Sequence, residues 1–344
     1  MPKLPDLDAP RFSNLFDLAR LPYFEVKNAR LVLADPNLGP SVDVHTHLGL
    51  SFVKKPTLDL TRETPTTELY LHSDKPIDFG VYMNKNYADY DLQAIERDMT
   101  SRVLGAGGMR ATHTLPNLLR DMEDLGIRRS VLLPIDFPFL SENSETWLDL
   151  SRGKDGIVCF GSVHPFKRGM EAHLDKLVAM GARGLKYHPA VQMVGPDHER
   201  AMKLFRMAGA RKLPVLFHCG PVDIETKMGR RLSQVKRYER ALAENPDTTF
   251  VLGHSGALQM DEAITFANKY PNVYYEIASQ SLPAVQRLIE VLPPGRLMVG
   301  SDWPFYHLAI PIAKVLLATE KDDKARKAVL YDNAAALFGL PARA

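Results

Sequence analysis

The sequence of 344 residues is 45% hydrophobic and 24% charged, which is typical of a soluble globular chain with a large buried core. Its 43 basic and 41 acidic residues give a net charge of +2, without the basic excess that nucleic acid or an anionic membrane would attract. Two cysteines are too few for a disulfide framework or a zinc ribbon, and no apolar run resembles a signal peptide or a membrane span. We therefore expect a cytoplasmic protein that binds neither nucleic acid nor membrane.

Short apolar runs alternate with amphipathic helical stretches along most of the chain. Parallel strands that are covered by helices on both faces produce this pattern. The clearest helical stretches are residues 115–126 and 169–181, each of which ends on a glycine. Eight strands are expected, at residues 41–47, 130–137, 157–165, 182–189, 214–220, 249–256, 272–279 and 296–304.

Eight strand–helix units fit a closed (β/α)8 TIM barrel of the α/β class, which would form a single domain over residues 41–344. An open, doubly wound sheet is the structural alternative, because periodicity alone does not distinguish the two. Residues 1–40 form a proline-rich N-terminal extension outside the repeat. The connection over residues 48–129 is far longer than a βα loop of about two to six residues, so we expect a lid or insertion over the strand ends.

Side chains that can bind a metal stand at the ends of several predicted strands. His45 and His47 end the first strand two positions apart, so their side chains share one face. Each such residue has an ordinary structural explanation when taken alone. In a closed barrel, however, the carboxyl ends of all strands meet at one mouth, where a common metal site is expected. The later strands contribute Lys186, His218, His254 and Asp302.

The motifs DVHTH, GLKYHP, VLFHCG, FVLGHSGA, MVGSDWP and NAAALFGL follow one another along the chain. As an ordered set they resemble the amidohydrolase superfamily of metal-dependent barrels. The closest resemblance is to the amidohydrolase-related branch (amidohydrolase 2) that includes aminocarboxymuconate-semialdehyde decarboxylase, and it covers residues 41–340. It implies a TIM barrel with a divalent metal at its mouth. The residues that match the family's metal-site positions are His45, His47, His218, His254 and Asp302.

Lys186 separates two forms of the site within this resemblance. In binuclear members the equivalent lysine is carboxylated and bridges two metals, and the equivalents of His218 and His254 bind the second metal. In the single-metal branch His218 completes the metal sphere with Asp302, and His254 is catalytic. An unmodified ammonium group has no lone pair to offer a metal. Because GLKYHP is closer to the single-metal branch, we expect one metal, or two if Lys186 is carboxylated.

Neutral imidazoles and a carboxylate suit Zn²⁺ or a similar divalent ion that keeps one position open. Such a metal lowers the pKa of a bound water from 15.7 to about 7. Asp302 is then expected to take the proton from the water, and His254 to polarise the scissile carbonyl unless it binds a second metal. The sequence thus predicts a metal-dependent hydrolase of an amide, ester or lactone.

Further residues near the strand ends are candidates for substrate binding. Basic loop residues, among them Arg230, favour a small substrate that bears a carboxylate. Trp303 is a candidate floor of the pocket, and His188 shares the face of Lys186. Within the predicted lid, the candidates to reach over the metal are Tyr82, Asn84, Lys85 and Tyr87.

Other functions remain open at this point. The same ligands would serve a metal-dependent, non-oxidative decarboxylase of an unsaturated or aromatic carboxylic acid, or a non-catalytic metal-binding protein. GHSGA nearly matches the G-x-S-x-G motif of serine hydrolases, with Ser255 as nucleophile followed by Asp302 and His307. That alternative leaves His45 and His47 without a role. A homo-oligomer is compatible with the family, but no interface can be identified from the sequence.

Overall fold

Eight parallel strands form the centre of the molecule in a computed structural model that describes residues 9–35, 38–53, 57–99, 105, 107–137 and 141–342. They coincide with the eight expected strands, although each is shorter than its apolar run. The barrel strands are β4 (Ser41–Thr46), β6 (Ile127–Leu132), β7 (Ile157–Cys159), β8 (Leu185–Tyr187), β9 (Val215–His218), β10 (Phe250–Gly253), β11 (Val273–Glu276) and β12 (Leu297–Met298).

The strands close into a barrel through two single bridges. Parallel pairing joins β4, β6 and β7 into one sheet, and β8 to β12 in consecutive order into a second sheet. Gly161 bridges to Leu185 between β7 and β8, and Thr46 bridges to Trp303 between β4 and the segment after β12. The molecule is therefore a closed (β/α)8 barrel, as expected, and the alternative of an open sheet is wrong.

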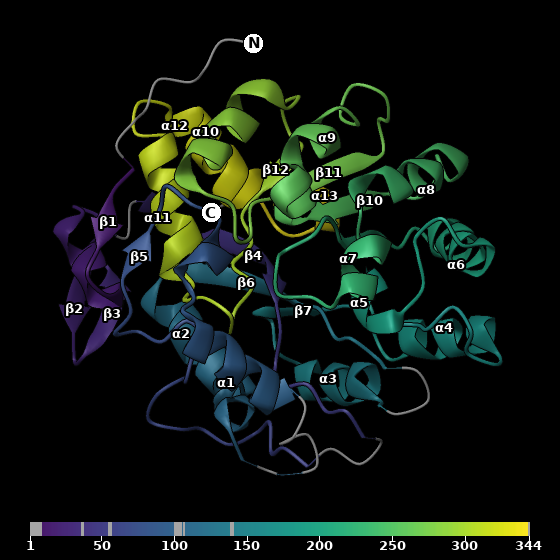
Figure 1. Cartoon of the computed structure of the whole chain (residues 1–344), viewed down its shortest axis with the longest axis horizontal. Coiled ribbons are helices and arrows are strands. Elements are labelled where there is room, and N and C mark those ends of the chain that lie inside the picture. Colours follow the sequence, from purple (N-terminus) through teal and green to yellow (C-terminus); the bar gives the residue numbers. More distant parts are fainter. Residues whose placement is uncertain are drawn as a thin grey trace.

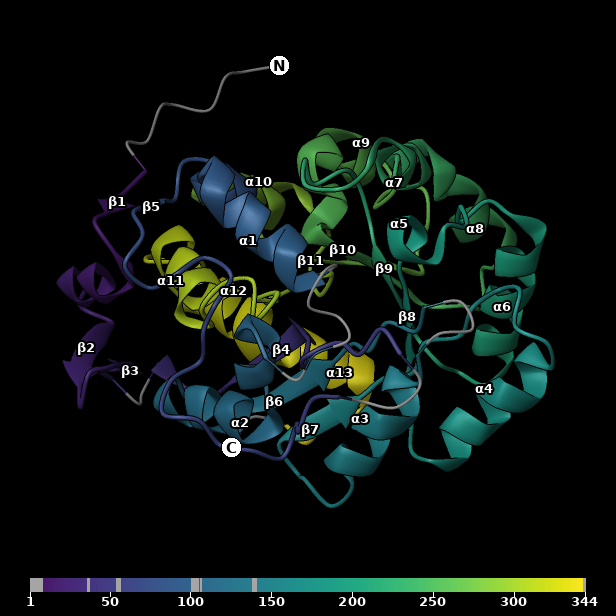
Figure 2. The same ribbon diagram turned by 60° about the horizontal axis from the view of Figure 1, so that its bottom comes forward.

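Helices surround the strands on the outside of the barrel (Figure 2). The two stretches with the clearest periodicity form α2 (Leu115–Asp124) and α4 (Met170–Ala179). Gly126 and Gly181 follow these helices with φ of +63° and +105°. None of the described helices is long and apolar enough to cross a membrane. The helices are α1 (Asp89–Met99), α2 (Leu115–Asp124), α3 (Asn143–Ser151), α4 (Met170–Ala179), α5 (Pro189–Gln192), α6 (Glu199–Ala210), α7 (Lys227–Leu232), α8 (Glu239–Glu244), α9 (Met260–Ile264), α10 (Leu282–Val291), α11 (Ala309–Ala318), α12 (Asp323–Lys327) and α13 (Asn333–Phe338), with shorter turns η1 (Leu15–Arg20), η3 (Met83–Asn86), η4 (Met109–Thr112), η5 (Val235–Arg237), η6 (His254–Gln259) and η7 (Ala328–Asp332).

The interior of the barrel is apolar beneath its mouth. Val42, Val44, Leu216 and Met298 belong to one buried cluster together with Phe338 of α13. Alternation along β9 places His218 on the same face as Leu216. The polar side chains at the strand ends therefore lie next to a buried apolar cluster.

The described part of the N-terminal extension, residues 9–35 and 38–40, pairs with the long insertion. Its strand β1 (Arg11–Phe12) is antiparallel to β5 (Ile77–Asp78), which lies within residues 48–129. Next to it, β2 (Phe24–Lys27) and β3 (Arg30–Leu33) form a hairpin. The extension and the insertion are thus joined by backbone hydrogen bonds.

Part of the insertion lies across the carboxyl ends of the barrel strands. We call residues 82–87 the lid segment. The N–H of Met83 donates to the carbonyl of Ser279 after β11 at 2.8 Å. The side-chain amide of Asn84 donates to the carbonyl of Val222 after β9 at 2.6 Å. The segment is therefore tied to the ends of two separate strands.

Lys314 of α11 is a buried cation on the outside of the barrel. Only 2% of its surface is exposed. Its Nζ donates to the carbonyl of Gln280 at 2.6 Å and lies 5.1 Å from the centre of the Phe79 ring. Burial lowers the pKa of Lys314 to about 7 from an ordinary value of 10.5, so the protonated form is costly in the folded protein.

This burial predicts a specific pH dependence of stability. Between pH 7 and 10.5 the unfolded chain holds a proton on Lys314 that the folded chain does not, so stability rises with pH through this window. The difference in unfolding free energy between wild type and Lys314→Met should therefore grow in favour of wild type from pH 7 to 10.5. Denaturant titrations measure it, with the exposed Lys321→Met as control. A difference for Lys314→Met that stays constant with pH would contradict the expectation.

Candidate metal centre

Three histidines at the mouth have their Nδ1 atoms engaged by polar partners. Nδ1 of His45 lies 2.9 Å from Oε1 of Glu276, and Nδ1 of His47 lies 2.7 Å from the carbonyl oxygen of Leu133. Nδ1 of His218 lies 3.1 Å from Nε2 of His254. A carbonyl oxygen only accepts hydrogen bonds, and so does an ionised carboxylate, so His45 and His47 carry their protons on Nδ1. This leaves their Nε2 lone pairs for a metal, as in known metal-binding histidines.

The Nε2 atoms of His45 and His47 face the carboxylate of Asp302. Its Oδ1 lies 3.7 Å from Nε2 of His45 and 3.4 Å from Nε2 of His47. Two ligand atoms that each lie about 2.0–2.2 Å from a tetrahedral metal are about 3.4 Å apart. The ligand atoms of these three residues all lie within 4.8 Å of one another. The donor set and its spacing therefore fit a divalent metal of the size of zinc.

Glu276, at the end of β11, supports this arrangement through the Nδ1 atom of His45. It is fully buried, and its Oε1 accepts from Nδ1 of His45 and from the N–H of His254, while Oε2 accepts from the N–H of Ala278 at 2.6 Å. Burial acts to raise its pKa, while the N–H groups of His254 and Ala278 and the charge of Lys186 act in the opposite direction and favour the ionised carboxylate. Each carboxylate oxygen is already bonded, so Glu276 orients His45 rather than adding a ligand. Its position in an apolar strand did not indicate this role.

Gly300 provides the space that Glu276 needs. A Cβ atom at position 300 would lie 2.3 Å from Oε2 of Glu276 and 3.0 Å from Cβ of His45. Contacts this short are not tolerated, so any larger residue would separate the carboxylate from the imidazole. The glycine of MVGSDWP is thus required by the packing behind the site.

Lys186, at the end of β8, lies beside the predicted ligands. It is 1% exposed, and its Nζ lies 3.1 Å from Nε2 of His45. Burial lowers its pKa to about 8, and the charges of Asp302 and Glu276 act in the opposite direction. The amine therefore lies next to the Nε2 atom that a metal would use.

His254 and His188 hold His218 in place. Nδ1 of His254 lies 3.3 Å from the carbonyl oxygen of Ala278, and burial lowers its pKa to about 4, so the ring is neutral. With the proton of His254 on Nδ1, its Nε2 accepts from His218 and leaves Nε2 of His218 free. The ring of His188 stacks on His218 with centroids 4.0 Å apart. His218 lies outside the close group of His45, His47 and Asp302.

The two other predicted substrate residues are engaged elsewhere. The guanidinium of Arg230 on α7 pairs with the carboxylates of Asp223 and Glu225. Trp303 is completely buried, and its Nε1 donates to Oδ2 of Asp121 on α2 at 3.2 Å. Both residues are thus held by carboxylates of the protein, and their contacts with a substrate stay predictions.

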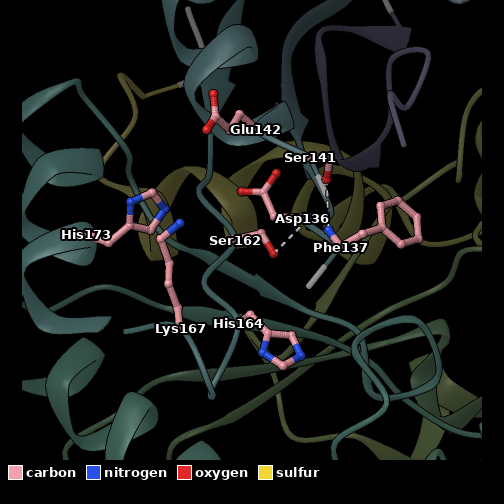
Figure 3. Close-up of a pocket in the computed structure, with 8 residues that line it drawn as sticks. All are labelled: Asp136, Phe137, Ser141, Glu142, Ser162, His164, Lys167 and His173. Carbon is pink, nitrogen blue, oxygen red and sulfur yellow. Dashed lines mark hydrogen bonds between the residues drawn. The ribbon is translucent and has the colours of Figure 1, made fainter. Parts of the chain in front are cut away.

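A cavity of about 140 Å³ lies between the segments that follow β6 and β7 (Figure 3). The carboxylate of Asp136 points into it, and burial raises the pKa of this group to about 6. Lys167, which follows β7, lies on the side of His173. None of the candidate metal ligands lines this cavity. Its lining residues are Asp136, Phe137, Ser141, Glu142, Ser162, His164, Lys167 and His173.

Ser255 does not form a catalytic triad. Its buried hydroxyl donates to the carbonyl of Glu276 at 2.8 Å. Nδ1 of His307 accepts from the N–H of Ala309 at 3.1 Å. Within the described ranges, no histidine is hydrogen-bonded to Ser255. The structure therefore does not support the alternative of a serine hydrolase.

A closed (β/α)8 barrel with imidazoles and carboxylates converging at its mouth defines a class of metal-dependent barrel enzymes. A family model described as "Amidohydrolase" matches residues 42–340. The chain belongs to the amidohydrolase family and is an enzyme of it, a metal-dependent hydrolase or decarboxylase.

Solved structures with the same fold cover most of the chain. An uncharacterised TIM-barrel protein from Bordetella bronchiseptica is 18% identical, with a TM-score of 0.63 over 87% of this chain and 98% of that one. 5-Carboxyvanillate decarboxylase from Sphingomonas paucimobilis is 14% identical, with a TM-score of 0.61 over 88% and 99%. A structure described as a probable 2-pyrone-4,6-dicarboxylic acid hydrolase from Acinetobacter baumannii is 15% identical, with a TM-score of 0.55 over 87% and 99%. Among curated proteins, none matches the chain.

The position of Glu276 predicts an effect on metal affinity. Glu276→Gln keeps the size of the side chain but removes the charge that orients His45, and such changes weaken metal binding by about 10- to 100-fold. Equilibrium titration with Zn²⁺ measures the affinity, and the exposed Glu290→Gln on α10 serves as control. If folded Glu276→Gln bound Zn²⁺ as tightly as wild type, the orienting role of Glu276 would be refuted.

Proposed function

We propose that the protein is a zinc-dependent hydrolase that adds water to the carbonyl carbon of an amide, ester or lactone in a small carboxylate-bearing substrate. One observation carries this proposal. The Nε2 atoms of His45 and His47 lie 3.7 and 3.4 Å from the carboxylate of Asp302. Their Nδ1 protons are engaged by Glu276 and by the carbonyl of Leu133. The cytoplasmic location expected from the composition is part of the proposal.

His45, His47 and Asp302 would hold the metal, and His218 is the proposed fourth ligand. When bound, a zinc ion supplies Lewis acidity that lowers the pKa of water and polarises a carbonyl. Asp302 is placed to accept the proton of the attacking water and to return it to the leaving nitrogen or oxygen. Glu276 keeps His45 in the orientation that this arrangement requires.

His254 is the second proposed catalytic group. Because its pKa is lowered to about 4, it remains a neutral imidazole and can act on a carbonyl oxygen only as a hydrogen-bond donor. Donation from Nε2 requires the tautomer that gives up two contacts, the long hydrogen bond of 3.3 Å from Nδ1 to Ala278 and the contact of 3.1 Å between Nε2 and Nδ1 of His218. The proposed contact with substrate therefore includes a shift of the proton from Nδ1 to Nε2.

Basic residues beside the mouth support a substrate that carries a carboxylate. A hollow of about 510 Å³ on α7 and η5 places five basic side chains around one space. Arg230 and Arg237 are paired with Asp223 and Asp197, and the remaining positive charge of the hollow attracts anionic molecules. The hollow is lined by Lys227, Arg230, Arg231, Gln234, Lys236 and Arg237.

Decarboxylation is the second candidate reaction. The same ligand set would orient a carboxylic acid while its C–C bond to the carboxylate breaks and the carbon takes a proton. The similarity to 5-carboxyvanillate decarboxylase favours keeping this candidate. Incubation with aromatic carboxylic acids, such as 5-carboxyvanillate, should release no carbon dioxide if the enzyme is a hydrolase. Stoichiometric release with loss of the acid would identify a decarboxylase instead.

Removal of the metal should abolish hydrolysis. Protein stripped with a chelator is expected to lose turnover of aryl ester and lactone substrates by about 100-fold or more and to regain it with Zn²⁺, because water then lacks Lewis-acid activation. A serine-directed reagent serves as control and should leave the rate unchanged. The proposal fails if the metal-free protein keeps its full activity.

The metal content of the same protein tests the number of metals. One equivalent per chain is expected for the single-metal form of the site. Two equivalents, together with a bicarbonate-dependent modification of Lys186 in a mass spectrum, would identify the binuclear form.

A further inference from the structure

The short segment that begins with His254 has an unfavourable backbone conformation. His254, Ser255 and Ala257 have positive φ, at +57°, +47° and +50°, and Gly256 between them has φ of +88°. Residues other than glycine disfavour positive φ, because their Cβ comes too close to a backbone carbonyl oxygen. We call residues 254–257 the His254 loop. Since the local preference of the chain opposes this conformation, contacts from the rest of the protein must hold it.

The side chain of Gln280 binds both ends of the His254 loop. Its Nε2 donates to the carbonyl of His254 at 2.6 Å and to the carbonyl of Ala257 at 3.1 Å. A side-chain amide has two N–H donors, and both are used here. Gln280 follows β11 and is 3% exposed, and its own backbone carbonyl accepts from Nζ of Lys314 at 2.6 Å. The residue is therefore anchored through its backbone, and its side chain fixes the first and last carbonyls of the loop.

The His254 loop lies directly against the chain that follows β9. Gly220 is the second residue after His218, and a Cβ atom there would lie 1.9 Å from the carbonyl oxygen of Gly256. The N–H of Leu258 donates to the carbonyl of Pro221 at 3.2 Å. A change in the loop would therefore alter its fit to the segment that carries His218.

The imidazole at the start of the loop contacts a proposed metal ligand. Nε2 of His254 lies 3.1 Å from Nδ1 of His218, and Nδ1 of His254 lies 3.3 Å from the carbonyl oxygen of Ala278. The ring of His254 and the carbonyl group that Gln280 binds belong to one residue. A backbone rotation at His254 would change the direction of the ring relative to that carbonyl, so the bond from Gln280 also constrains the ring.

We propose, building on the proposed hydrolase function, that Gln280 is a positioning residue of the candidate metal centre. By binding the His254 loop at both ends, it keeps the ring of His254 against His218 and so orients Nε2 of His218, the proposed fourth ligand. Gln280 acts through His254 and takes no part in the bond changes of the reaction. An amide suits this role because an ionised carboxylate of the same length has no N–H to donate to the two carbonyls.

Gln280→Met keeps the length of the side chain and removes both N–H donors. A matched control lies at the opposite end of β11, where the amide of Asn272 donates to the carbonyls of Asn245 at 3.1 Å and Thr248 at 2.9 Å. Gln280→Met and Asn272→Leu should both lower the melting temperature, because each leaves backbone carbonyls without a donor. Equilibrium titration should show Zn²⁺ binding weakened by about 10-fold in Gln280→Met and unchanged in Asn272→Leu, since only the former loosens the support of His218.

Nitrogen NMR of the metal-free protein gives a readout that loss of stability alone does not change. The ring nitrogens of His254 and His218 report which nitrogen carries each proton, and His254→Asn assigns their resonances. In Gln280→Met both rings should shift toward the averaged resonances of a free neutral imidazole, because the contact between them is loosened. Asn272→Leu should leave both rings as in the wild type.

These measurements separate this inference from the proposed function, because neither requires turnover. If the wild type hydrolyses no substrate but Gln280→Met changes both Zn²⁺ affinity and the ring resonances, the hydrolase proposal fails and the positioning role stands. The inference is overturned if Gln280→Met matches Asn272→Leu in either measurement. Should Gln280→Met not fold, Gln280→Asn replaces it in both measurements, since its amide is one methylene too short to keep both hydrogen bonds.

Discussion

The contact between Glu276 and His45 is the interaction on which the rest of the site depends. It joins the end of β11 to the end of β4, fixes the proton of His45 on Nδ1 and directs Nε2 toward Asp302. The same carboxylate also accepts hydrogen bonds from the backbone N–H groups of His254 and Ala278. One buried acid thus sets the orientation of side chains from several strands. Gly300 is required for its position.

The barrel and the convergence of its ligands were predictable because both follow from local pattern. Apolar runs at regular intervals gave all eight strands, and the closed topology brought their carboxyl ends together. His45, His47 and Asp302 were identified because side chains at strand ends must face one mouth. Their positions at the strand ends were enough to predict that they lie together, without information on how the other side chains pack.

The sequence could not predict contacts that depend on exact packing. Glu276 stood in an apolar strand, and the available signal was an acid on the inward face at the carboxyl end of VYYE. The bond between His218 and His254 depends on the left-handed backbone at His254, with φ of +57°, which no local pattern indicates. The partner of Trp303, Asp121, is 182 residues away in the sequence, so this contact could not be predicted from local pattern.

The pairing of β1 with β5 has a consequence for the boundaries of the catalytic unit. Residues 11–12 supply the backbone partners for the strand that leads into the lid segment, and an ion pair of Arg11 with Asp78 at 2.7 Å accompanies them. A truncated protein that begins at the first barrel strand would keep every candidate ligand yet leave the edge of β5 unpaired. We therefore expect the smallest stable catalytic unit to include β1, because β1 pairs with the strand that leads into the lid segment.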